Sequence, residues 1–319
     1  MTTYPRFRVS ALCVLLLMVA LPAAAQDHLR PTADAVRVVG SEDLGFEAAH
    51  PAWSPDGAQI AFTRPGYDGI WVVSPDGQQV RQITDEASAG FGFSWSPDAE
   101  EILARVSRVD GIRGLHAVKV FAIATSESRQ LTEYRSRMPA LPQWTVDGSA
   151  IILPLPAGAE VLEAVESADA DAPLFVGDDR GLAAVYHRNE STRTERVLSD
   201  IRVLNAVASP DGSRIVFEEI GGDLHVVNAD GTELISIGSG HRPTWSPDGA
   251  WIAFMRTEDN GKNFTSSDIY AARADGSEVV PLTQTTDRLE MNPSWSPDGS
   301  HIAYDDLQSG AIFILPVAW

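Results

Sequence analysis

The sequence predicts an all-β fold, a six-bladed propeller built from four-stranded antiparallel blades, and three observations lead to this fold class. A seven-residue pattern that ends in Ser-Pro-Asp-Gly in most copies recurs six times along the chain. A short apolar strand follows each copy, and a second hairpin with its own Asp-Gly turn often comes next. The spacing of about forty residues is that of one propeller blade.

The repeated pattern predicts a tight hairpin between the first two strands of each blade. In this turn Ser accepts backbone hydrogen bonds, Pro fixes φ, Asp bonds its own backbone and Gly supplies a left-handed residue. Ala99 replaces Gly in the second copy, Thr145-Val146 replace Ser-Pro in the third, and Ala208 replaces Trp in the fourth. The six copies begin at Pro51, Phe93, Pro142, Ala206, Pro243 and Pro293.

The strand that follows each turn is apolar on consecutive residues, as in Ile60-Ala-Phe62. Such a strand is buried on both faces, which stacked blades require. The residues at the Trp position of the motif are therefore interpreted as blade core, with a sugar-stacking platform as the less favoured alternative. They are Trp53, Trp95, Trp144, Ala208, Trp245 and Trp295.

Closure of the ring is also predicted from the sequence. The last repeat contains three candidate strands, at residues 292–295, 301–305 and 311–316. The segment Val36–Val39 precedes the first repeat, and we expect it to complete the last blade and remove the open sheet edges. The propeller would then span residues 36–319, with an acidic insertion at about residues 157–179 of blade three, interpreted as a flexible surface loop in which residues 160–167 could form a short helix.

The N-terminal 25 residues have the features of a signal peptide. Arg6 and Arg8 precede an apolar run at residues 11–21, and three alanines end at Ala25, so we expect cleavage before Gln26. An uncleaved membrane anchor is the alternative, which the short apolar run disfavours. Residues 26–35 would form a short linker. Cleavage removes Cys13, the single cysteine, so the mature chain is predicted to be periplasmic or secreted, without disulfides or thiol chemistry.

Composition and motifs exclude several functions. The formal net charge of −20 disfavours nucleic acid and anionic membrane surfaces as partners. The chain lacks a Gly-x-Ser-x-Gly elbow, a His-Glu-x-x-His motif, a Walker loop and a dinucleotide fingerprint, so we predict no enzymatic activity and no catalytic residue. We expect no cofactor and no metal-binding residues, and leave open only a structural cation in the channel. The motif aspartates are interpreted as turn residues; they are Asp56, Asp98, Asp147, Asp211, Asp248 and Asp298.

Taken together, the Trp-Ser-Pro-Asp-Gly turns, the Asp-Gly second turns and the pairs Leu131-Thr132 and Leu282-Thr283 resemble the TolB-like, WD-repeat-like propeller family. The resemblance covers roughly residues 36–319. It implies a periplasmic propeller that binds or scaffolds a protein or peptide partner. A carbohydrate-binding or hydrolytic propeller with its site in the central channel is the alternative function.

The candidate site follows from the alternation of strand direction within a blade. The four strands, here named A to D from the inside outward, place the Asp-rich A–B and C–D turns at one end and the longer D–A and B–C loops at the other. The residue three positions before each motif Trp position is expected at the channel rim. This ring holds one His, one Arg, two amides and no carboxylate, and its members are His50, Gly92, Leu141, Asn205, Arg242 and Asn292.

Binding residues commonly lie on variable loops carried by a rigid scaffold. We therefore predict that a monomeric propeller docks a partner segment, one with a carboxylate or acidic side chain, at the mouth formed by the D–A and B–C loops. Arg offers such a group paired hydrogen bonds. The alternative is that the candidate residues given next are solvated loop residues without a binding role. The candidate partner-binding residues are His50, Arg135, Arg137, Arg202, His241, Arg242 and Arg288.

Overall fold

The computed structural model describes residues 28–319 except for 139, 146–147, 156–157, 165–172, 179 and 189–190. The predicted signal peptide and the motif residue Asp147 lie outside the described residues. Among the described residues, no helix has the length and apolar composition that a membrane span requires.

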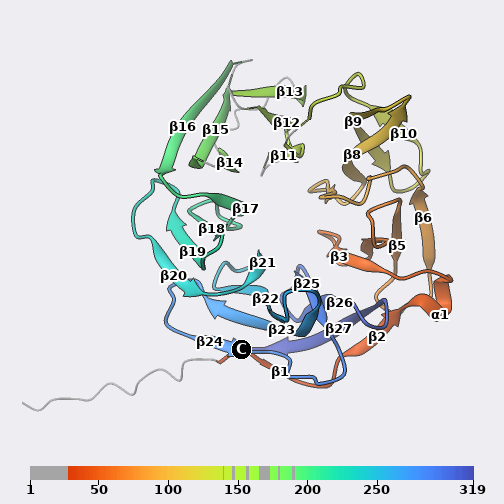
Figure 1. The fold of residues 1–319 in the computed structure, drawn as a ribbon, viewed down its shortest axis with the longest axis vertical. Coiled ribbons are helices and arrows are strands. Elements are labelled where there is room, and N and C mark those ends of the chain that lie inside the picture. The colour runs from red at the N-terminus through yellow and green to blue at the C-terminus, as the bar shows by residue number, and fades with distance from the viewer. Residues whose placement is uncertain are drawn as a thin grey trace, which may run out of the picture.

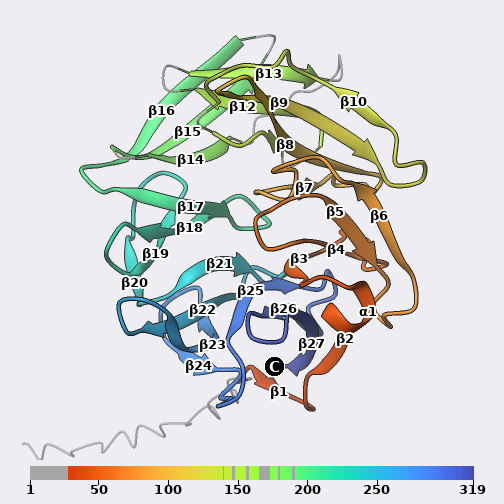
Figure 2. The same cartoon turned by 45° about the vertical axis from the view of Figure 1, so that its right-hand side comes forward.

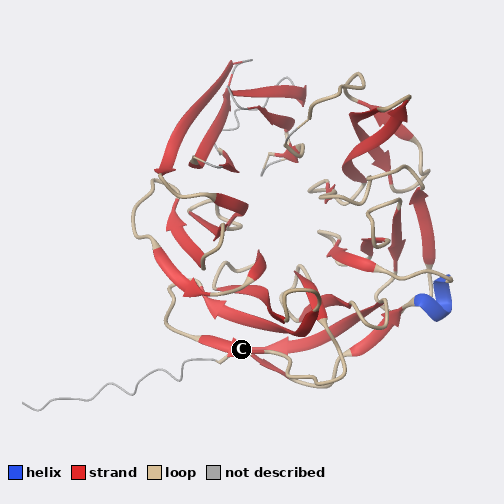
Figure 3. Ribbon diagram, in the orientation of Figure 1, coloured by secondary structure: helices blue, strands red, loops and turns tan. Residues whose placement is uncertain are grey.

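The strands form seven antiparallel sheets arranged in a ring, so the predicted number of six blades is wrong (Figures 1 and 3). Four of the blades have the predicted succession of strands A to D along the chain, and blade 7 completes the same succession with a strand that precedes blade 1. Blade 1 contains β3 (Ala49–Trp53), β4 (Ile60–Thr63), β5 (Ile70–Val73) and β6 (Val80–Thr84). Blade 2 contains β7 (Ser94–Trp95), β8 (Glu101–Asp110), β9 (Arg113–Ala122) and β10 (Ser128–Gln130).

The second half of the ring follows the same plan (Figure 2). Blade 5 contains β17 (Val203–Ala208), β18 (Arg214–Glu219), β19 (Leu224–Asn228) and β20 (Ile235–Gly238). Blade 6 contains β21 (His241–Trp245), β22 (Trp251–Asp259), β23 (Phe264–Arg273) and β24 (Val279–Pro281). Blade 7 contains β25 (Glu290–Trp295), β26 (His301–Asp306) and β27 (Ala311–Ala318).

The additional blade arises from the segment that the sequence suggested was a loop. Blade 3 contains β11 (Gln143–Trp144), β12 (Ala150–Leu155) and β13 (Gly158–Ala164), and blade 4 contains β14 (Leu174–Asp178), β15 (Gly181–Arg188) and β16 (Ser191–Ser199). The expected insertion at residues 157–179 therefore supplies β13 and β14. A short helix was suggested for residues 160–167, but residues 160–164 belong to the strand β13. Asp178 pairs with Gly181, so two residues join β14 to β15 where the other blades use the longer motif turn. A count of motifs misses this blade for that reason.

The predicted closure of the ring is present. β2 (Val36–Val39) pairs antiparallel with β27, with Val36 opposite Ile314 and Val39 opposite Ile312. A further strand, β1 (Arg30–Pro31), pairs with the end of β27, so part of the predicted linker belongs to the last sheet. The single described helix, α1 (Ser41–Leu44), connects β2 to blade 1. The last blade thus holds strands from both ends of the described chain.

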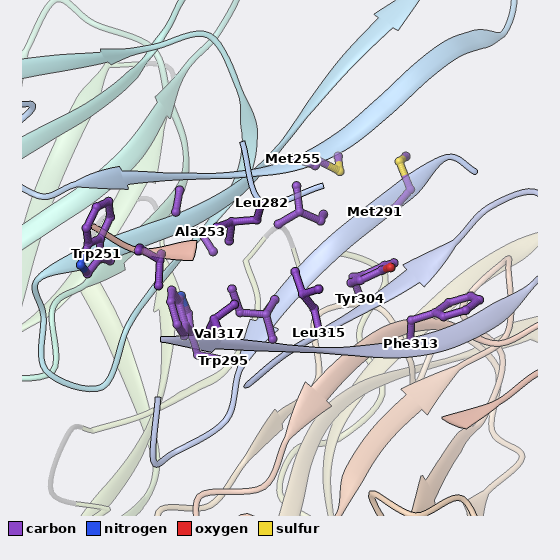
Figure 4. Packing of buried hydrophobic residues seen from close by; sticks show 14 of the residues in the cluster. Trp251, Ala253, Met255, Leu282, Met291, Trp295, Tyr304, Phe313, Leu315 and Val317 are labelled. Carbon is purple, nitrogen blue, oxygen red and sulfur yellow. The ribbon is translucent and has the colours of Figure 1, made fainter. Parts of the chain in front are cut away.

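Blades pack face to face through large buried side chains. Between blades 6 and 7, Trp251, Tyr304 and Phe313 belong to one apolar cluster (Figure 4). Burial of each such side chain is worth about 1.5–3 kcal/mol. The indole of Trp95 donates to the Ala52 carbonyl of the preceding blade at 3.0 Å, and that of Trp245 donates to the Val207 carbonyl at 2.9 Å. Every residue at the motif Trp position belongs to an apolar cluster or packs against one, which confirms the interpretation of these positions as blade core.

The motif turns have the predicted hydrogen bonds. In the first copy the Ser54 hydroxyl donates to Asp56 Oδ1 at 2.6 Å, and the Ala58 amide donates to the same oxygen at 3.0 Å. These bonds favour the carboxylate and lower the pKa of Asp56. The turn role holds for each described motif aspartate, namely Asp56, Asp98, Asp211, Asp248 and Asp298. Within the described part of the chain, no group of three His, Cys, Asp or Glu side chains is placed to hold a metal ion.

Candidate binding site in the central channel

A cavity of about 630 Å³ lies at the centre of the ring, and all seven blades contribute to its wall. This volume falls in the range of about 300–1,000 Å³ that is usual for binding pockets. Blade 4, which has no copy of the motif, contributes Phe175, Val176 and Gly177. All six residues of the predicted ring line the cavity: His50, Gly92, Leu141, Asn205, Arg242 and Asn292.

The ring residues reach the cavity because four of the inner strands contain a β-bulge. In blade 1, Ala49 pairs with Thr63 and Ala52 pairs with Ala61, so one extra residue lies on the inner strand. The inner strands of blades 5, 6 and 7 shift register in the same way. A bulge bends the strand and re-aims a side chain. Here it turns residues of a blade's innermost strand toward the channel.

Each of these bulges places a residue other than glycine in the left-handed region. The φ angles are 54° at His50, 48° at Asn205, 55° at Arg242 and 50° at Asn292. In blade 2 the equivalent residue is Gly92, with φ of 67°. The left-handed conformation costs an ordinary L-residue roughly 1–2 kcal/mol, whereas Gly adopts it freely and Asn tolerates it. His50 and Arg242 are therefore the strained members of the ring.

Two buried carboxylates hold the bulges in place. Glu218 of β18 accepts from Asn205 Nδ2 at 2.5 Å and from the backbone amide of Arg242 at 2.7 Å. Asp305 of β26 accepts from Asn292 Nδ2 at 2.9 Å and from the backbone amide of His50 at 3.0 Å. Each carboxylate thus joins the bulge of its own blade to the bulge of the next blade around the ring.

Burial sets the charge states at this wall. Burial raises the pKa of Asp305 to about 7, and its hydrogen bonds oppose that rise only in part. Burial and the nearby Arg242 cation lower the pKa of His50 to about 4, so this imidazole is neutral at pH 7. The His50 ring also lies 4.9 Å from the ring of Tyr67, which lines the same cavity. His50 is therefore a packed, uncharged part of the wall.

The remaining charge on the described wall is positive. It comes from Arg105 and Arg242, and no described Asp or Glu lines the cavity, although the chain has 44 acidic residues and a net charge of −20. Arg242 is exposed, and no described carboxylate forms an ion pair with its side chain. Arg105 donates to the Met138 carbonyl at 2.8 Å, while its buried Nε has no hydrogen-bond partner. Burial lowers the pKa of Arg105 because no acid compensates the lost hydration.

The other five predicted site residues do not line the cavity. Arg135 forms an ion pair with Glu160, with N–O distances of 2.5 and 2.6 Å. His241 bonds Glu218 through Nδ1 at 3.2 Å. The structure thus places His50 and Arg242 in the channel wall and leaves Arg135 and His241 engaged with acids beside it.

The remaining three predicted residues, Arg137, Arg202 and Arg288, are also absent from the cavity wall. The guanidinium of Arg288 stacks on the ring of Phe313 at 4.4 Å, and Arg137 and Arg202 are exposed. Sequence reasoning missed Arg105 of β8, which follows Gly92 by the same interval that separates Glu218 from Asn205 in blade 5. Alignment of the second strands of the blades, in addition to the motif turns, would have identified this position.

Comparisons with known proteins agree with the fold. The structure is similar to that of putative TolB from Agrobacterium tumefaciens, with a TM-score of 0.51, 18% sequence identity, and coverage of 85% of this chain and 89% of that one. Weaker similarities have a TM-score of 0.49. TolB from Acinetobacter baumannii is 16% identical over 86% of this chain and 64% of its own, and an oligogalacturonate lyase in complex with manganese is 13% identical over 85% and 78%.

Sequence comparison adds one short match. A segment of 67 residues is 40% identical to the uncharacterized peptidase YuxL of Bacillus subtilis strain 168. That segment is 19% of this chain and only 10% of the relative, so the chain spans a small part of the curated protein that it matches. No protein-family model matches the chain. The similarity to the Agrobacterium structure shows a β-propeller fold.

Proposed function

We propose that this chain is an exported, TolB-like binding propeller that takes an anionic segment of a protein partner into its central channel, without catalysing a reaction. One observation carries the proposal. In a chain with a net charge of −20, the described channel wall contains two arginines without an acidic partner and no carboxylate. An Arg guanidinium offers a carboxylate two parallel hydrogen bonds, which makes it well suited to bind one.

The size of the site favours a short segment as the bound element. A cavity of about 630 Å³ admits a few residues of a partner but not a folded domain. The lowered pKa of His50 keeps the imidazole uncharged near neutrality, so the anion would bind at the guanidinium groups. The general net negative charge would repel anions elsewhere on the surface and so direct them to the channel.

An acidic oligosaccharide is the second candidate. The rings of Tyr67, Phe91 and Phe93 line the cavity beside Arg105, and aromatic rings with a cation suit a sugar acid as well as a peptide. Oligogalacturonate therefore serves as the competing ligand in the test of the proposal.

Affinity capture from an extract of the source cells tests the proposed function. The bait is the mature chain, compared with Arg242→Glu and with the matched control Arg30→Glu, an exposed arginine of β1 that does not line the cavity and is not among the candidate site residues. We expect Arg242→Glu to lose the partner and the control to retain it, with both variants melting within ~2 °C of the parent because surface changes rarely exceed ~0.5 kcal/mol. Capture that survives Arg242→Glu would contradict the proposal, and displacement of the partner by oligogalacturonate alone would favour the second candidate.

A further inference from the structure

The wall of the channel differs in chemistry between its two sides. Blades 2, 3 and 4 are consecutive, and they contribute mainly apolar groups; this apolar arc contains Phe91, Phe93, Leu141, Pro154 and Phe175. Blades 5, 6, 7 and 1 contribute most of the polar groups of the wall, among small apolar residues and Leu204 and Val207; the polar groups of this polar arc include Asn205, Arg242, Thr244, Asn292 and His50. Because each arc is a run of neighbouring blades, the two arcs face each other across the ring (Figure 1).

Two buried carboxylates fix the backbone of the polar arc. Glu218 and Asp305 lie behind the polar arc and hold the bulges of blades 5, 6, 7 and 1. At the equivalent position of blade 3 the residue is Pro154, which itself lines the cavity. The second strands of blades 5 and 7 therefore carry the carboxylates that fix the bulges of all four blades of the polar arc.

An extended peptide has the periodicity that such a channel would recognise. Successive side chains of an extended chain point to opposite sides. A segment lying between the arcs would present every second residue to Arg242 and its amide neighbours, and the intervening residues to Phe91 and Leu141. Acidic side chains suit the first side because Arg242 has no acidic partner among the described residues, and apolar side chains suit the second.

Arg105 adds a second anionic contact at the border between the arcs. It belongs to blade 2, next to blade 1, and its guanidinium lies 5.2 Å from the Phe91 ring. Its buried Nε has no hydrogen-bond partner, and no described carboxylate pairs with it. A further carboxylate of the segment would satisfy this cation.

We propose that the channel recognises an extended peptide segment in which acidic and apolar side chains alternate. The acidic side chains face Arg242 and the amides of the polar arc, and the apolar side chains contact Phe91 and Leu141. This inference rests on the proposed function, because it requires that the channel take a peptide.

Three labelled peptides of identical composition test the pattern by fluorescence anisotropy with the mature chain. The first alternates Asp and Leu over eight residues, the second joins four Asp to four Leu, and the third spaces Leu at helical intervals. All have blocked ends and equal charge. We expect the alternating peptide to bind at least about ten times more tightly than the other two. Each of the other two would lose the burial of at least two methylene groups, at ~0.8 kcal/mol each, which corresponds to that factor in affinity.

Variants of each arc separate the two halves of the inference. Leu141→Asn should reduce the preference for the alternating peptide to about twofold or less, whereas Leu234→Asn, a matched control at an exposed leucine outside the cavity, should leave the preference unchanged. Arg242→Met should weaken all three peptides by a similar factor. The melting temperature of each variant shows whether it is folded.

The outcomes distinguish this inference from the proposed function. Equal affinity for the three peptides, or tightest binding of the helical pattern, would overturn the alternation and leave an anion-binding channel in place. Absence of binding by all three would also overturn the inference. Capture of a cellular partner that depends on Arg242 would then still support the proposed function.

Discussion

Replacement of Asp305 by Asn should change how the stability of the protein depends on pH. The pKa of this buried carboxyl rises from 3.8 to about 7 on folding. Its ionisation therefore opposes folding, and the penalty begins near pH 4, grows through pH 7 and is constant above that. A rise of about 3 pH units corresponds to about 4 kcal/mol at pH 8 and, with the unfolded side chain mostly ionised, about 2 kcal/mol at pH 5.

The Asn variant keeps an oxygen that can accept from Asn292 and from the His50 amide, but it has no charge to bury. We expect the free energy of unfolding of the parent to fall by about 2 kcal/mol relative to Asp305→Asn between pH 5 and pH 8. Urea unfolding at several pH values measures this difference. Titration of His50 is common to both proteins and cancels in the comparison.

Asp298→Asn is the matched control. Hydrogen bonds from Ser296 and Ser300 lower the pKa of Asp298 to about 2, so this carboxyl is ionised in both the folded and the unfolded state from pH 5 to pH 8. Its replacement should shift stability by a constant amount over that interval. Parallel stability curves for the parent and Asp305→Asn would refute the reasoning, because they would mean that Asp305 is ionised in the folded protein at pH 5.

Two further predictions concern the ring. Arg242→Gly should raise the free energy of unfolding by about 1 kcal/mol, because Gly relieves a left-handed φ of 55° and no described ion pair is lost; lower stability in urea unfolding would contradict this. Deletion of residues 28–40 should lower the melting temperature by about 10 °C, since it exposes an edge of β27 and removes the buried Leu29 and Val39, each worth about 1.5–3 kcal/mol; an unchanged melting temperature in calorimetry would show that β2 does not seal the ring.

The fold was largely predictable because the motif turn is a strong local signal. Five blades carry both the turn and the four-strand succession, and the closing strand followed from counting strands in the last repeat. Blade 4 was missed because a two-residue connection between Asp178 and Gly181 replaces the motif. Its second strand, Gly181–Arg188, is apolar over its first residues like those of the other blades, so strand patterning carried a signal that the motif count ignored.

The site was predictable in position but not in conformation. The interval before each motif Trp identified six residues that line the cavity, because the repeats keep their register. The left-handed bulges were not predicted, since three of the four bulge residues stand directly before Pro, where an extended conformation is expected. The buried acids Glu218 and Asp305 were also missed. They interrupt otherwise apolar strands, and their role depends on hydrogen bonds to the bulge of the neighbouring blade, which the sequence of one repeat does not reveal.

The strain at the bulges identifies Arg242 as the residue most in need of a functional explanation. Gly92 shows that the backbone of this position is satisfied by a residue without a side chain. Asn205 and Asn292 use their side chains to bond buried carboxylates, and His50 packs beside Tyr67. Arg242 alone among these left-handed residues has an exposed, charged side chain for which the described structure provides no ion pair or hydrogen bond, although Glu218 holds its backbone. Backbone strain at a residue whose side chain makes no internal hydrogen bond or ion pair is expected where that side chain is held ready for a ligand. We expect Arg242→Gly to stabilise the protein and to abolish partner capture, because a strained residue held for ligand binding explains both results. If Arg242→Gly retains capture, the anion does not bind at Arg242.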